Sequence, residues 1–103
     1  MKSSCCKSQS KEMKNIGQIG DSIRALDEPN RLKILCLLKQ GERCVCDIHE
    51  PLNLAQNLAS HHLKVLRDAG LIDFRKEGTK VVYFRNEENI TKFQKLLKEI
   101  LSI

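Results

Sequence analysis

The feature that most constrains the fold is a short helix, a tight turn and a longer helix in the middle of the chain. Residues 47–52 predict the short helix, which ends at Pro51 and the Asn53 turn. Residues 55–69 predict the longer one, closed by Gly70 in the C-terminal position that glycine favours. Two helices joined in this way form the unit that lays its second helix in the major groove of DNA.

Two segments that favour β-strands come next, residues 71–76 and 80–85. The connection between them, residues 77–79, is short and contains a glycine, so the pair predicts a hairpin. A hairpin directly after a helix-turn-helix is the wing of a winged helix. The predicted fold class is therefore α+β, mostly α: a winged helix-turn-helix with a two-stranded β-hairpin wing.

Apolar stripes at helical spacing predict one helix on each side of this unit. They consist of Ile16, Ile19, Ile23 and Leu26 near the N-terminus, and of Ile90, Phe93, Leu97 and Ile100 near the C-terminus. A chain of 103 residues is too small to cover two such narrow stripes, so we expect both to pack against a second copy. The alternative is that each stripe caps the core of the monomer. The expected assembly is a homodimer formed through the N- and C-terminal helices.

A further helix, predicted to start after Asp27, forms the centre of the core. Asp27 is expected to cap it, with Glu28 and Pro29 in the first turn, where both are favourable. Cys36 lies within the apolar residues 34–38 of this helix. It is expected to act as a small buried apolar side chain.

The N-terminal segment has a different composition, because residues 1–14 hold four lysines, four serines and almost no apolar side chains. Nothing in this composition would fix the segment to a core, so we predict a flexible tail over residues 1–14. Residues 15–103 are expected to form a single DNA-binding and dimerisation domain.

Composition also excludes several classes of protein. The longest apolar run, residues 34–38, is far shorter than the ~20 residues of a membrane span, and the N-terminus has no apolar signal region, so we expect a cytoplasmic protein.

Five cysteines, an odd number, then indicate free thiols or metal ligands and no disulfide framework. No cysteine stands with a histidine and an acid in a recognisable catalytic pattern, so no enzyme is expected. Lysine and arginine outnumber aspartate and glutamate by 18 to 13, which weakly favours a polyanionic partner.

These elements, in this order, resemble the ArsR/SmtB family of winged-helix metal-sensing repressors. The resemblance spans roughly residues 16–101 and rests on four motifs, at residues 25–35, 43–48, 54–72 and 74–80. It implies a homodimeric repressor that binds a palindromic double-stranded operator and releases it when an ion binds.

The longer helix of the central unit carries the expected DNA contacts. Leu58, Leu63 and Leu66 are expected on its apolar side, and the polar side then holds Gln56, Asn57, Ser60, His61 and Lys64. Such a face is often merely solvated, but the resemblance favours contact with DNA. The two amides suit adenine, Ser60 and Lys64 suit phosphates, and His61 suits either. His62 is expected to lean inward as a packed, hydrogen-bonded residue.

The wing supplies the second expected contact with DNA. Arg75, Lys76 and Lys80 flank its turn, where a cationic tip reaches the minor groove or the backbone. The alternative is that half of these side chains face solvent and do not contact DNA. Because phosphate contacts release counterions, the binding of operator DNA should depend steeply on salt.

Cys44 and Cys46 are the candidate sensing residues. Residues i and i+2 project about 200° apart on a helix but to the same side of an extended segment. The two thiols can therefore meet one ion only at the start of the short helix, where the sequence puts them. Exposed amides at that helix start are expected to lower the thiol pKa values. The alternative is a pair of small buried apolar residues.

The Cys-Val-Cys-Asp-Ile run of residues 44–48 resembles the thiolate motif of the family's arsenic sensors and of its cadmium and lead sensors. In the arsenic type a third cysteine follows three positions later; here that residue is His49, a possible ligand or a surface histidine. The cadmium and lead type adds thiolates from an N-terminal arm, commonly of the partner subunit. This resemblance assigns that role to Cys5 and Cys6, although these two are adjacent and the family's arm cysteines are usually spaced.

Two cysteines of the motif and one from the tail would make a three-sulfur site. Such a site suits As(III), Sb(III), Bi(III), Pb(II) or Cd(II), and suits Zn(II) less without a fourth ligand. The expected inducer is As(III)/Sb(III) or Cd(II)/Pb(II). The open alternatives are a redox or sulfide sensor that uses the same thiols, and a DNA-binding dimer without an inducer. The zinc site that other members build on paired C-terminal helices is expected to be absent, because residues 86–103 contain no histidine.

Overall fold

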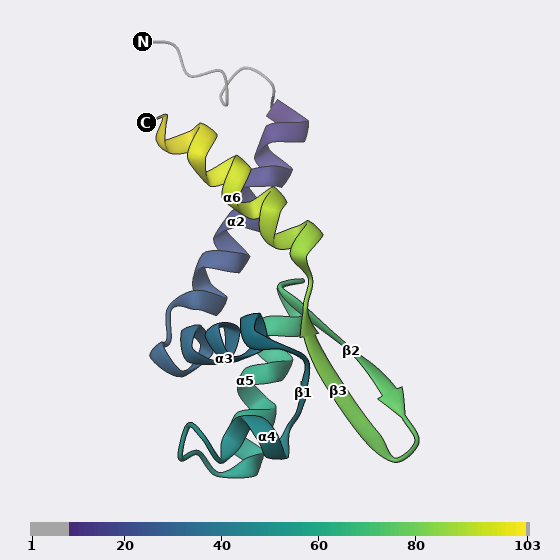
Figure 1. Ribbon diagram of the computed structural model, residues 1–103. Helices are drawn as coiled ribbons and strands as arrows, with labels where there is room; N and C mark the ends of the chain where they lie inside the picture. The colour runs from purple at the N-terminus through teal and green to yellow at the C-terminus, as the bar shows by residue number, and fades with distance from the viewer. Residues whose placement is uncertain (1–8, 103) are drawn as a thin grey trace.

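The computed structural model describes residues 9–102, with side-chain surroundings from Ile16 onward, and it has the expected winged-helix architecture (Figure 1). The elements in chain order are α2 (Gln9–Leu26), α3 (Pro29–Gln40), β1 (Arg43–Cys44), α4 (Cys46–His49), α5 (Gln56–Asp68), β2 (Ile72–Glu77), β3 (Lys80–Arg85) and α6 (Glu87–Leu101). Helices α2 and α6 pack together at one end of the elongated molecule, and α3, α4, α5 and the sheet form the other end.

The sheet contains one strand more than the sequence predicted. Strands β2 and β3 form the expected antiparallel hairpin, closed by a two-residue turn between Glu77 and Lys80. Gly78 opens this turn with φ of 65°, a left-handed conformation that glycine adopts without strain. The additional strand, β1, pairs antiparallel with the outer edge of β3, so the order is β1-β3-β2. The two residues of β1 are too few for a sequence pattern, because only their pairing with β3 makes them a strand.

The core lies where α3, α4, α5 and β2 meet. Its largest fully buried side chains come from these four elements and are Ile34, Ile48, Leu63, Leu66 and Ile72. Complete burial of side chains of this size contributes about 1.5–3 kcal/mol each. The helix-turn-helix pair is therefore fixed by apolar packing from both of its helices.

The cap of α3 is one residue later than the sequence predicted. Glu28, not Asp27, is the N-cap: its carboxylate accepts hydrogen bonds from the amides of Asn30 at 2.8 Å and of Arg31 at 3.2 Å. The reason is Pro29, because a residue before proline is forced into the extended conformation that an N-cap requires. Glu28 has this conformation, with φ −164° and ψ 121°.

The expectation that Cys36 is buried is wrong, since its side chain is exposed. The buried side of α3 is defined by Ile34 and Leu38. These two residues are four positions apart and share a face, whereas position 36 is turned by about 200° from Ile34. Cys36 consequently lies away from the core.

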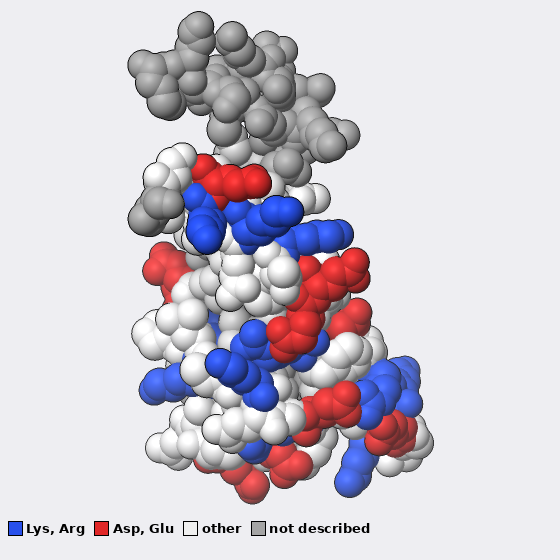
Figure 2. All heavy atoms as spheres, turned by 45° about the horizontal axis from the view of Figure 1, so that its top comes forward, with Lys and Arg blue, Asp and Glu red and all other residues white. Residues whose placement is uncertain are grey.

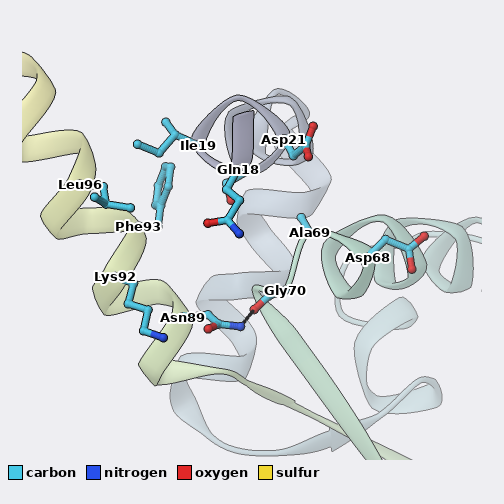
Figure 3. A pocket seen from close by; sticks show the side chains of 11 residues that line it. Gln18, Ile19, Asp21, Asp68, Ala69, Gly70, Asn89, Lys92, Phe93 and Leu96 are labelled. Atoms are coloured by element: carbon cyan, nitrogen blue, oxygen red, sulfur yellow. Dashed lines mark hydrogen bonds between the residues drawn. The ribbon is translucent and has the colours of Figure 1, made fainter. Parts of the chain in front are cut away.

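The terminal helices bury only part of their apolar stripes. Ile19 and Ile90 are buried, whereas Ile16, Ile23, Ile100 and Leu101 are between 41% and 57% exposed. A cleft of about 300 Å³ lies between α2, α6 and the end of α5, with Phe93 and Leu96 facing Ile19 across it (Figure 3). A single copy therefore leaves apolar surface open along both helices.

Helical structure begins at Gln9, earlier than the domain boundary at residue 15 that the sequence predicted. Residues 1–8, which include Cys5 and Cys6, lie outside the described residues. The flexible tail stays a prediction. None of the helices in the described part of the chain is both long and apolar enough to cross a membrane.

Candidate thiolate site and nucleic-acid interface

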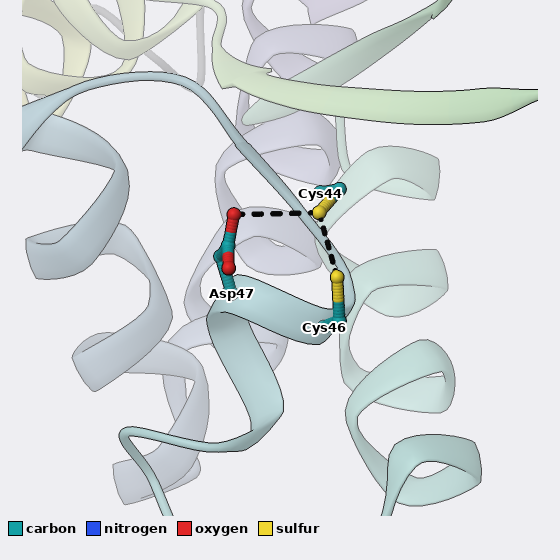
Figure 4. Close-up of side chains that lie close together, drawn as sticks. All are labelled: Cys44, Cys46 and Asp47. Carbon is teal, nitrogen blue, oxygen red and sulfur yellow. Dashed lines mark hydrogen bonds between the residues drawn. The ribbon is translucent and has the colours of Figure 1, made fainter.

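The two cysteines of the motif lie on either side of a strand-to-helix junction. Cys44 ends β1, Val45 follows, and Cys46 is the first residue of α4. The two Sγ atoms lie 2.9 Å apart, so one thiol donates a hydrogen bond to the other sulfur (Figure 4). Cys44 is half-buried and Cys46 is exposed, which leaves the pair open to an incoming ion.

Asp47 adds a third potential ligand atom at this junction, one that the sequence pattern did not predict. Its Oδ2 atom lies 3.4 Å from the Cys44 sulfur. The two sulfurs and a carboxylate oxygen all lie within 4.8 Å of one another, and no other group of this kind occurs among the described residues. An acidic residue next to a cysteine is common, so only the local turn of the chain identifies Asp47 as a candidate ligand.

His49 belongs to a different set of contacts. It is the last residue of α4, and its Nδ1 atom lies 3.1 Å from the backbone oxygen of Leu54. The ring therefore bonds to the turn between the two helices and is not a member of the group formed by the thiols and Asp47.

The electrostatics of the junction differ from the sequence prediction. The hydrogen bond with Cys44 raises the pKa of the Cys46 thiol, and partial desolvation and the negative charges of Cys44 and Asp47 raise it further. The prediction of a lowered pKa is wrong for this residue, because the hydrogen bond with Cys44 favours the protonated thiol and an acid stands beside it. An ion that binds here must displace the Cys46 proton.

The polar side chains predicted to contact DNA lie on one exposed side of α5. The buried side of this helix consists of Ala59, His62, Leu63 and Leu66. The exposed residues are Gln56, Asn57, Ser60, His61 and Lys64. Leu58, which the sequence analysis placed on the apolar side, is 43% exposed, because Ala59 occupies that position of the buried stripe. The face therefore combines hydrogen-bonding side chains with one exposed leucine.

Two residues of this region already have partners. Lys64 Nζ lies 2.8 Å from Asp68 Oδ2, and this hydrogen bond lowers the pKa of the Asp68 carboxyl. His62 is only 5% exposed and accepts a hydrogen bond at its Nδ1 from Arg31 Nε, at 3.2 Å. Arg31 also donates to the backbone oxygen of Ala25, at 3.2 Å. The prediction of an inward, hydrogen-bonded His62 is confirmed, and the contacts of Arg31 tie the end of α2 to α5.

The three wing cations are exposed but are not equivalent. Arg75 is held by two carboxylates: its Nη1 donates to Glu42 Oε2 at 2.9 Å, and its Nε donates to Glu77 Oε2 at 2.7 Å. Lys76 and Lys80 have no ion-pair partner within residues 16–102. Figure 2 shows basic and acidic side chains interspersed over the face that it displays.

Known proteins are similar to this chain in both sequence and fold. Residues 28–73 match the model of the family described as bacterial regulatory protein, arsR family. An HTH-type transcriptional regulator of Methanocaldococcus jannaschii, itself uncharacterized, is 36% identical over 89 residues, which cover 85% of this chain and 100% of that protein. An arsenical resistance operon repressor of Staphylococcus xylosus is 41% identical over 71 residues, 69% of this chain and 68% of the repressor.

Two further similarities concern the ligand class and the assembly. A homologue of the cadmium resistance regulator CadC from Staphylococcus aureus is 38% identical over 65% of this chain, which spans just over half, 56%, of that protein. The homodimeric winged helix-turn-helix DNA-binding domain of a possible ArsR-family regulator from Mycobacterium bovis superposes with a TM-score of 0.76 at 30% identity. That superposition covers 91% of this chain and 87% of the domain.

Proposed function

Because the chain belongs to the ArsR family of DNA-binding transcriptional regulators, which are not enzymes, we propose that it represses transcription from a palindromic operator as a homodimer. A soft ion bound at Cys44 and Cys46 releases the repressor from DNA. The observation that carries this proposal is the meeting of two thiols and a carboxylate directly before the helix-turn-helix. The arsenic and cadmium resistance named for two of the relatives supports the class of ion.

The exposed side of α5 contacts the major groove. Gln56 and Asn57 reach base edges, Ser60 and Lys64 bind phosphates, and His61 does either. The two wing lysines without an ion-pair partner, Lys76 and Lys80, bind the phosphate backbone of the operator DNA. These assignments are supported by the exposure of all seven side chains.

Dimerisation places two α5 helices on one face of the DNA. The exposed apolar residues of α2 and α6, among them Ile16, Ile23 and Ile100, supply the contact surface. The homodimeric domain of the Mycobacterium bovis regulator supports the same assembly. Two α5 helices related by a two-fold axis fit half-sites about 34 Å apart, which requires a palindromic operator.

The ligand that joins the two thiolates decides which ion binds. Asp47 with the two thiolates gives a mixed sulfur and oxygen site within one chain, which suits Cd(II) or Pb(II). As(III) and Sb(III) prefer a third sulfur, which Cys5 or Cys6 would supply, from the same subunit or from its partner. Either way the sulfur pair must open, because even the short zinc–sulfur bonds of about 2.3 Å put two sulfurs of a tetrahedral site about 3.8 Å apart. The present separation is 2.9 Å.

The proposal is tested by operator binding of the full chain under reducing conditions, measured by fluorescence anisotropy with and without Cd(II) or As(III). Cys44→Ser and Cys46→Ser should retain operator affinity and lose release by the ion. Cys36→Ser is the matched control, since Cys36 is also an exposed thiol and lies outside the junction. Release that persists in both Cys44→Ser and Cys46→Ser would exclude the thiolate site.

A redox sensor is a second candidate, because the 2.9 Å contact of the two sulfurs also favours their oxidation. Hydrogen peroxide would accept two electrons from the pair, one S–S bond would form, and two thiol protons and the two peroxide oxygens would leave as water. Counting free thiols after one equivalent of peroxide, alongside operator binding, distinguishes this function. Operator release that follows thiol loss, and does not follow added ion, supports the redox function.

A further inference from the structure

The proposed ion site and the wing share one row of the sheet. Cys44 in β1 pairs with Val82 in β3, and Val82 pairs on its other side with Arg75 in β2. Adjacent strands lie about 4.8 Å apart, so two strand spacings separate the backbone of the cysteine from that of the arginine. This row therefore runs from the proposed ion site to β2, which carries Arg75 and Lys76.

A side-chain contact closes the same path. The Arg75 guanidinium binds both carboxylate oxygens of Glu42, at 2.5 and 2.9 Å, in a two-pronged arrangement that fixes direction as well as distance. Glu42 immediately precedes β1 and stands two residues before Cys44. Among the ion pairs of residues 16–102, this is the one that joins the wing hairpin to the segment leading into the thiol junction.

The same arginine is anchored within its own strand. Its Nε donates to Glu77 at 2.7 Å, next to the hairpin turn. The two carboxylates together raise the pKa of the Arg75 guanidinium, and its hydrogen bond lowers the pKa of Glu42. Both groups of the Glu42–Arg75 pair therefore stay charged.

We propose that the Glu42–Arg75 pair is the link through which ion capture reorients the wing, an inference that rests on the proposed function. Opening of the sulfur pair displaces Cys44 and, with it, the segment that holds Glu42. Arg75 follows its partner carboxylate and turns β2 together with the hairpin turn, which moves Lys76 in β2 and Lys80 at the start of β3 away from the DNA backbone. Arg75 thus positions the wing. It binds Glu42 and does not contact a DNA phosphate, as the sequence had suggested it would.

The test compares three substitutions that each remove one carboxylate and leave the same net charge. Glu42→Gln breaks the link, Glu77→Gln breaks only the contact within the wing, and Glu87→Gln breaks the unrelated pair of Glu87 with Arg85. Each full-length variant is titrated with Cd(II), and ion binding is followed by the ultraviolet thiolate band. Operator affinity is measured with and without the ion. A thermal melt verifies that each variant is folded.

Ion-induced loss of operator affinity in the wild type is expected to be in the range of about 5- to 150-fold that allosteric coupling usually gives. In Glu42→Gln this ratio should fall towards one, while Cd(II) binding is unchanged. Glu77→Gln and Glu87→Gln should keep the wild-type ratio. The exchange of both partners, Glu42→Arg with Arg75→Glu, should restore part of the response that either single exchange removes.

The possible failures are distinct. If Glu42→Gln keeps the full ratio while Cys44→Ser loses release, the link is refuted and the thiolate site stands. Equal losses of the ratio in all three carboxylate variants would also refute the link, because they would show a general effect of charge. If Cys44→Ser still responds to the ion, the proposed function itself fails.

Discussion

The helix proposed to contact DNA and the segment proposed to sense the ion are neighbours in sequence but are held in different ways. Helix α5 is anchored by Leu63 and Leu66, both completely buried in the core. The junction before α4 has an exposed Cys46, an exposed Asp47 and no side-chain hydrogen bond at the helix cap. Segments with few buried contacts open and shift at low cost in free energy. The chain thus combines a firmly packed helix, proposed to contact DNA, with a lightly held segment, proposed to bind the ion.

The largest expected effect tests the anchored side. Leu63→Ala removes a fully buried side chain and should lower the free energy of unfolding by about 2–5 kcal/mol, through lost burial and a residual cavity. Urea denaturation at one fixed protein concentration measures this difference, because dimerisation makes stability depend on concentration. Leu58→Ala is the matched control on the same helix and should cost less than about 1 kcal/mol. Equal losses in the two variants would contradict the contrast between the regions.

The next effect tests the sensing side. Asp47→Asn removes the carboxylate from the proposed donor group and should weaken Cd(II) binding by at least about tenfold, since loss of even an outer partner of a metal ligand costs that much. Its cost in stability should be small, because Asp47 is exposed. Competition with a chromophoric chelator gives the affinity. An unchanged Cd(II) affinity would exclude Asp47 as a ligand and direct attention to Cys5 and Cys6.

A smaller change is expected at the wing. Replacement of both Lys76 and Lys80 by glutamine should reduce the slope of log affinity against log salt by about two, because each phosphate contact contributes about 0.9. Operator binding measured from low to moderate salt gives the slope. The same measurement on Glu87→Gln serves as a control for charge. An unchanged slope in the double variant would remove the wing from the DNA interface.

The smallest expected effect concerns acid. Burial lowers the pKa of His62; the facing carboxylate of Glu28 opposes this, and the positive charges of Arg31 and His61 add to it. Below the ordinary histidine pKa of about 6.5, His62 binds a proton in the unfolded chain but not in the folded protein. The free energy of unfolding should therefore decrease as the pH decreases, until the lowered pKa of folded His62 is reached. Denaturation curves from pH 7 to pH 5 measure this slope. His62→Gln should remove it, and a slope that persists unchanged would assign it to another group.

The fold was largely predictable from local signals of known physical origin. Gly70 ends α5 with φ of 80°, and Gly78 opens the hairpin turn, so both glycines mark boundaries that other residues fill poorly. Strand β1 was not predictable, since it exists only through pairing with β3. The α3 cap was misplaced by one residue because Asp27 and Glu28 both offer carboxylates, and the effect of Pro29 on its predecessor decides between them.

The candidate site was predictable in part. The spacing of Cys44 and Cys46 predicts that they meet at the start of the short helix, and the sulfur contact of 2.9 Å agrees with this. Asp47 carried no distinguishing signal, because exposed acids are common. The partners of Arg75 were also hidden, since Glu42 is 33 residues away in sequence and reaches it only when β1 joins the sheet.

The most direct test of the central claim follows ion capture and operator release in the same sample of full-length protein. Cd(II) is added stepwise to the protein on fluorescently labelled operator DNA, with the ultraviolet thiolate band and the anisotropy recorded at each step. The proposal predicts that both signals change together and level off at the same ratio of ion to subunit, and that neither changes in Cys44→Ser. A thiolate band that saturates while the protein stays on DNA, or release without the band, would contradict it.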